Sequence, residues 1–188
     1  YVDIEKSNID VIFTSVQKAF AMPPGLAVCV VNDKAYEWEK EKSSSSWYGG
    51  FQRNIDYYKK KGQTHSTPAI SLMLAYREQM KHMLEETQKG RSDRHKDMAE
   101  YTQKWALEHF DMFPEEGYWS QTVSTIKNTR GINIAELREE INKKYDMVFS
   151  NGYGSQLKEK TFRIGHMGDH TVENVKELTD AIEDVAGL

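Results

Sequence analysis

The chain has little of several things that commonly define a protein class. Cys29 is the only cysteine among 188 residues and stands in an apolar run, so one chain can form neither a disulfide framework nor a cysteine zinc site. Such sparse cysteine usage is typical of the reducing cytoplasm, where we expect this protein. No segment reaches the ~20 apolar residues of a membrane span. Two prolines interrupt the most apolar stretch, 20–31, and we expect no membrane association.

An excess of basic residues is also missing. Lysine and arginine total 25 against 29 acidic residues, which gives a net charge of −4 with both signs mixed along the chain. Because nucleic-acid binding needs a basic face, we expect no nucleic-acid partner. The first residues lack the charged and apolar regions of a signal peptide and read like the middle of a domain.

The N-terminal half contains two apolar runs and one long helical pattern. Residues 11–14 and 25–32 predict buried strands. The polar segment 34–63, with serines at 43–46, predicts an exposed excursion. A helix is expected from Ser66 or Thr67 to a stop at Gly90, and a second one over 92–109. The first carries an apolar stripe that we expect in the core: Ile70, Met73, Leu74, Met80, Met83 and Leu84.

The C-terminal ~70 residues predict a β-α-β-β-α layer design. Strands are expected in 117–128, 147–154 and 160–168. Two amphipathic helices are expected over 133–146 and 171–188, with Asn133 and Thr171 as their N-caps.

Lys18 follows the first strand and precedes a stiff Pro-Pro-Gly turn, 23–25. A lysine held in a partly dry site loses its charge easily, and a neutral amine is what Schiff-base chemistry needs. The alternative is a surface lysine whose stem lies over Phe20. Arg163 interrupts an apolar strand, which suits either a structural ion pair or a fork for a carboxylate ligand.

Hydroxyl side chains precede the long helix in 64–69, "THSTPA". They predict either a phosphate site at the helix start or plain helix capping. The histidines at 65, 166 and 170 have no metal-ligand spacing, and neither G-x-S-x-G, a P-loop nor H-E-x-x-H occurs. We therefore expect no metal site.

Taken in order, three segments resemble class V aminotransferases, which are fold-type I enzymes dependent on pyridoxal 5′-phosphate (PLP). They are "SVQKAFAMPPGLAV" (15–28), "THSTPAISLMLAYREQM" (64–80) and "KTFRIGHMGDHTVENVKELTDAI" (160–182). The serine–pyruvate/alanine–glyoxylate and phosphoserine aminotransferase branches are the most similar. Only the C-terminal half of the family is matched, so the aspartate that pairs with the pyridinium nitrogen has no counterpart here.

The resemblance implies an α/β protein with the type I PLP-dependent transferase fold. Residues 1–90 would be the end of the large PLP-binding domain with the long interdomain helix, and 91–188 the small C-terminal α+β domain. The implied activity moves an amino group from an amino acid of the serine, phosphoserine or alanine type to a 2-oxo acid. A homodimer with shared active sites is implied as well.

Residue roles also follow from the resemblance. Lys18 would form the internal aldimine with PLP and move the substrate proton. Arg163 would bind the substrate α-carboxylate. The other implied cofactor contacts are Gln17, beside the phosphate, with Ser15, and, for the PLP phosphate of the neighbouring subunit, Thr67 with Thr64 or His65.

Two other interpretations remain open. The chain could be a non-catalytic remnant that serves as a dimerisation or binding module. A cysteine desulfurase or lyase is disfavoured, because such relatives often need a reactive cysteine on a mobile loop and Cys29 lies in a predicted core strand. Phosphoserine as substrate would require extra basic groups, for which His65, His166 and Arg53 are candidates.

Overall fold

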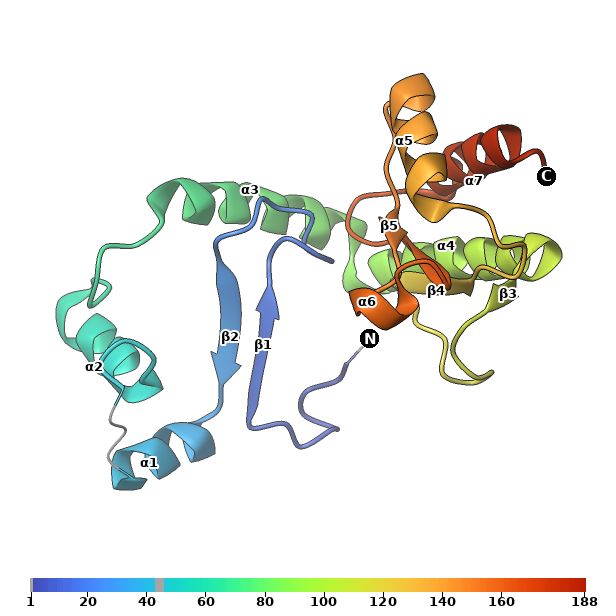
Figure 1. Ribbon diagram of the computed structural model, residues 1–188. Helices are drawn as coiled ribbons and strands as arrows, with labels where there is room; N and C mark the ends of the chain where they lie inside the picture. Colours follow the sequence, from blue (N-terminus) through green and yellow to red (C-terminus); the bar gives the residue numbers. More distant parts are fainter. Residues whose placement is uncertain (1, 43–45) are drawn as a thin grey trace. The chain divides into compact units, whose positions relative to one another are not determined.

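A computed structural model describes residues 2–42 and 46–188 (Figure 1). The chain divides into two compact units, Tyr1–His82 and Met83–Leu188. Three of the four consecutive serines, 43–45, lie outside the described residues. Within the described ranges, no helix combines the length and the apolar character that crossing a membrane requires.

Unit 1 contains an antiparallel pair of strands, β1 (Val11–Ser15) and β2 (Ala27–Val31), which confirms both predicted strands. The expectation of an exposed excursion over 34–63 was wrong, because helices α1 (Asp33–Lys42) and α2 (Phe51–Lys61) form there. Local caps explain both helices. The Asn32 side chain accepts a hydrogen bond from Ala35 N (2.9 Å), and Gly62 ends α2 in the left-handed conformation.

Helix α3 spans Ile70–Glu86, where the long helix was predicted, but its stripe is not a core. Ile70 is 57% exposed and Leu74 50%. The expected stop at Gly90 was also wrong. The break falls at Thr87, which has a φ of 69° and accepts a hydrogen bond from Gly90 N as the N-cap of α4 (Gln88–His109).

Unit 2 is an α+β layer structure, as predicted. Its antiparallel sheet has the order β3-β4-β6-β5, and β4 occupies only part of the strand expected over 117–128. The strands are β3 (Asp111–Met112), β4 (Val123–Lys127), β5 (Ser150–Asn151) and β6 (Thr161–Gly165). The helices besides α4 are α5 (Ile134–Tyr145), the short α6 (Gly154–Leu157) and α7 (Val172–Ala186). Asn133 and Thr171 cap α5 and α7, as expected.

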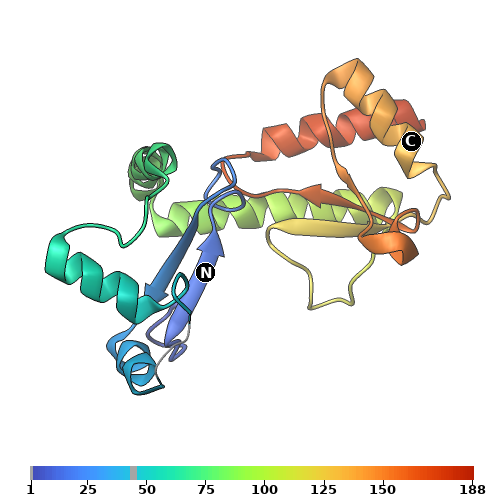
Figure 2. The same ribbon diagram turned by 60° about the vertical axis from the view of Figure 1, so that its left-hand side comes forward.

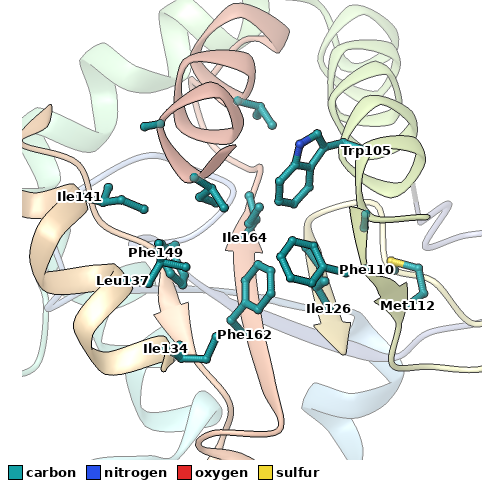
Figure 3. Close-up of a cluster of buried hydrophobic side chains, with 14 of the residues drawn as sticks. Trp105, Phe110, Met112, Ile126, Ile134, Leu137, Ile141, Phe149, Phe162 and Ile164 are labelled. Atoms are coloured by element: carbon teal, nitrogen blue, oxygen red, sulfur yellow. The ribbon is translucent and has the colours of Figure 1, made fainter. Parts of the chain in front are cut away.

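The core of unit 2 lies between its sheet and the helices α4, α5 and α7 (Figures 2 and 3). Phe162 and Ile164 of β6 are fully buried in this core. The ring of Phe162 meets those of Phe110 and Phe149 edge-on, at centroid distances of 5.1 and 5.5 Å. Because side chains alternate along a strand, Arg163 lies on the opposite face of the sheet, away from the core.

Candidate functional site

The turn that carries Lys18 is anchored through Val16, the residue just after β1. Val16 is fully buried. Its N–H donates to Leu26 O (3.2 Å), and its carbonyl accepts from Met22 N (3.1 Å). Inside the turn, Ala21 N donates to Lys18 O (2.9 Å). The backbone around Lys18 is therefore held at both ends.

The same turn packs against α3. The rings of Phe20 and Tyr76 are stacked, with centroids 5.9 Å apart. Gly25 has a φ of +125°, and a Cβ at this position would lie 2.9 Å from the Leu72 side chain. The chain comes so close to α3 here that the turn needs a glycine.

The side chains of Lys18 and Gln17 are exposed, whereas Ser15 is half-buried. The Lys18 amine makes no hydrogen bond or ion pair with any residue that the structure describes. The partly dry surroundings expected for this amine are not present within the chain. A rigid backbone thus presents an unpaired primary amine to solvent.

A second group of candidate residues precedes α3. The Thr64 hydroxyl donates to Ser66 O (2.8 Å), and Thr67 is exposed. The His65 ring lies 5.3 Å from that of Trp47 and 6.0 Å from that of Tyr48, between centroids. Both His65 ring nitrogens are buried and have no partner in the described part of the chain. Such orphaned polar atoms are uncommon and call for a ligand or solvent.

Arg53, a candidate for binding a second phosphate, belongs to the same group. Its guanidinium carbon lies 4.5 Å from the Trp47 ring centroid, so Arg53 and His65 both contact Trp47. The structure places this group and the Lys18 turn on different parts of α3. About 9 Å of helix axis separate Ile70 from Tyr76, at 1.5 Å per residue.

Arg163 lies in unit 2 and is half-buried. Its Nε donates to Asn151 O (3.1 Å), and its guanidinium carbon lies 5.5 Å from the Tyr153 ring centroid. The first alternative for this residue, a structural ion pair, is not formed with any described residue. The terminal nitrogens of the guanidinium are left for a ligand.

His166 cannot act as the accessible basic group considered for phosphoserine. It is fully buried, and its Nε2 lies 2.9 Å from Ser124 Oγ. Burial lowers the pKa of His166 to about 4, and the nearby His95 lowers it further. The imidazole is therefore neutral near pH 7 and holds the structure together.

Cys29 lies in β2, as predicted, but it is exposed rather than in a core. The reason for disfavouring a desulfurase is thus weakened, although a strand is not a mobile loop. Among the described residues, no group of three or more His, Cys, Asp and Glu side chains is arranged to hold a metal ion.

Two contacts escaped the sequence reasoning. Trp47 was hidden in a segment interpreted as an irregular excursion. Tyr153 was noted only as part of a glycine-rich turn, although a large aromatic residue between two glycines at the end of a strand is a signal that could have been used.

Comparisons with known proteins give consistent results over half of the relatives' length. No protein-family model matches the chain. An uncharacterized aminotransferase of Methanocaldococcus jannaschii is 36% identical over 171 residues, covering 89% of this chain and 44% of the relative. The small subunit of a soluble hydrogenase from Synechococcus is 25% identical over 189 residues, covering 98% and 47%.

Among solved structures, an alanine–glyoxylate aminotransferase from Nostoc superimposes with a TM-score of 0.89 at 22% identity, over 99% of this chain and 50% of the other. Further relatives and neighbours include serine–glyoxylate and phosphoserine aminotransferases. These findings confirm the resemblance and the predicted fold class: the homologues and structural neighbours are class V aminotransferases. The chain spans about half the length of the curated relatives it matches.

Proposed function

We propose that this chain is the C-terminal half of a PLP-dependent aminotransferase that transfers an amino group from an amino acid of the serine, phosphoserine or alanine type to a 2-oxo acid. The observation that carries the proposal is the Lys18 turn, a fixed backbone with an unpaired amine. The aminotransferase relatives support it. In this proposal, residues 1–90 belong to the large PLP-binding domain and 91–188 form the small domain.

Bound PLP would supply an electron sink for the carbanion that forms at the substrate α-carbon. Lys18 would hold the cofactor covalently through its amine. Once released, the same amine would take the proton from the α-carbon and return it to the cofactor side as general base and acid. Gln17 and Ser15 would contact the cofactor, Gln17 at its phosphate. Closure of the site by the rest of the protein would exclude water and favour the neutral amine.

The residues before α3 fit a phosphate. Thr64 and Thr67 offer hydroxyl donors, and the buried unpaired nitrogens of His65 lack a partner that a phosphate oxygen would provide. Because the Lys18 turn and this group lie on different parts of α3, we assign the group to the PLP phosphate of a second subunit. A homodimer with shared active sites follows from this assignment.

Arg163 would bind the substrate α-carboxylate, which both the amino acid and the 2-oxo acid carry. Its Nε is engaged by Asn151 O, so the two terminal nitrogens are left to form a bidentate pair. This arrangement would hold the α-carbon at one place in both halves of the reaction.

The test compares the PLP-loaded full-length protein with Lys18→Ala. We expect a visible absorbance band that alanine or serine abolishes in the wild type, and neither band nor transamination in the variant. Lys61→Ala serves as the matched control, because Lys61 is also an exposed lysine of unit 1. An unchanged band in Lys18→Ala would refute the assignment. PLP binding without transamination of any amino acid would favour the non-catalytic module.

A further inference from the structure

We propose that Tyr153 is a positioning residue that orients the Arg163 guanidinium for the substrate carboxylate. This inference rests on the proposed function and adds a residue to the carboxylate site. Tyr153 follows β5 and caps the start of α6. Its ring lies against the one side of the Arg163 guanidinium for which the structure records an aromatic contact, at 5.5 Å.

Two contacts together determine how the guanidinium lies. The hydrogen bond from Nε to Asn151 O fixes one edge of the planar group. A single hydrogen bond still allows the plane to swing about that edge. The Tyr153 ring restricts this swing, since a cation is attracted to the face of an aromatic ring within about 6 Å. The terminal nitrogens then point in a defined direction before any substrate arrives, which lowers the entropic cost of binding.

The backbone that carries Tyr153 is itself fixed. Gly152 is buried so tightly that a Cβ there would lie 1.9 Å from Leu157 O and 2.4 Å from Thr161 Oγ1. On the α5 side, Arg138 Nε donates to Phe149 O (2.7 Å). The position of Tyr153 relative to β6 is therefore set by the core of unit 2, and the residue does not sit on a freely moving loop.

Tyr153 has no role in that core, because its side chain is 79% exposed. A ring left in water gains little from folding, so its removal should leave the unfolding free energy nearly unchanged. The ring is expected to act through its face rather than its hydroxyl. Phenylalanine should then replace it, whereas alanine should not.

The first readout is the steady-state kinetics of the full-length PLP-loaded enzyme. Tyr153→Ala should raise KM for both the amino acid and the 2-oxo acid by about 2- to 5-fold, the range of an exposed cation–π contact, with kcat nearly unchanged. Tyr153→Phe should behave like the wild type. Tyr118→Ala is the matched control, because Tyr118 is also 79% exposed in unit 2, and it should have no effect.

A second readout does not depend on catalysis. In an NMR titration of the 188-residue chain with pyruvate, the Arg163 Nε–H resonance should shift saturably, with a dissociation constant about 2- to 5-fold higher in Tyr153→Ala. A shift without any transaminase activity would support Tyr153 while refuting the proposed function. Equal KM values in wild type and Tyr153→Ala, an effect of Tyr153→Phe as large as that of alanine, or no response of Arg163 to pyruvate would each overturn the proposal.

Discussion

Acidification from pH 7 to pH 5 should destabilise unit 2 through the buried His166. Its pKa is about 4 in the folded protein and 6.5 as the reference value, with burial as the main cause. Between these values the unfolded chain binds a proton that the folded chain does not, so stability falls as the pH falls. At about 1.4 kcal/mol per pH unit, the 1.5 units from 6.5 to 5 correspond to a loss of about 2 kcal/mol.

His95 adds to the loss in the same direction, because burial lowers its pKa as well. Its Nε2 accepts a hydrogen bond from Gly168 N (3.1 Å), and a proton on Nε2 would remove that bond. The window from pH 7 to 5 is chosen to stay above the carboxylates of unit 2. The pKa of Glu86 is lowered by Arg94, and that of Asp184 by Lys144, so both titrate at lower pH.

The assay is urea unfolding followed by tryptophan fluorescence at pH 7, 6 and 5. The substitutions Trp38→Phe and Trp47→Phe leave Trp105 and Trp119, both in unit 2, as reporters. His166→Asn removes the titrating group and should flatten the pH dependence by about 2 kcal/mol. His82→Asn is the control, because His82 is exposed and stays in water on unfolding. A wild-type loss below about 0.5 kcal/mol, or an undiminished slope in His166→Asn, would refute this reasoning.

Two further substitutions test the packing that supports the site. Phe162→Ala removes a fully buried ring and should cost about 3–5 kcal/mol of unfolding free energy in urea titrations, whereas a loss under about 1 kcal/mol would contradict the described core. Gly152→Ala forces a Cβ against Leu157 O and should cost at least about 1–3 kcal/mol. Because the shift would also move Asn151 and Tyr153, Gly152→Ala should raise KM for the 2-oxo acid, and wild-type kinetics and stability together would show that the hairpin is not held as described.

Local signals predicted unit 2 well. Asn133 and Thr171 are caps whose side chains bond to a nearby backbone N–H, so short-range sequence suffices to find them. The alternation in "TFRIG" placed Phe162 and Ile164 in the core. The break between α3 and α4 was misplaced because Gly90 is a strong helix breaker, yet here its N–H serves the cap at Thr87.

Long-range packing was harder to predict. The stripe with Ile70 and Leu74 indicated a buried face, but a periodic pattern does not say what covers it, and within this chain both side chains are exposed. Helices α1 and α2 lack such a stripe and have no buried side chain, so a charge-rich sequence concealed them. The contact of Arg163 with Tyr153 depends on how β5 pairs with β6, which spacing along the chain does not reveal.

The central claim is that Lys18 is the cofactor lysine, and borohydride reduction tests it most directly. The full-length protein would be loaded with PLP, reduced and cleaved, and the modified peptide identified by mass spectrometry. The account predicts a pyridoxyl group on Lys18, with the same peptide unmodified when PLP is omitted. Modification of another lysine with Lys18 left free would contradict the account.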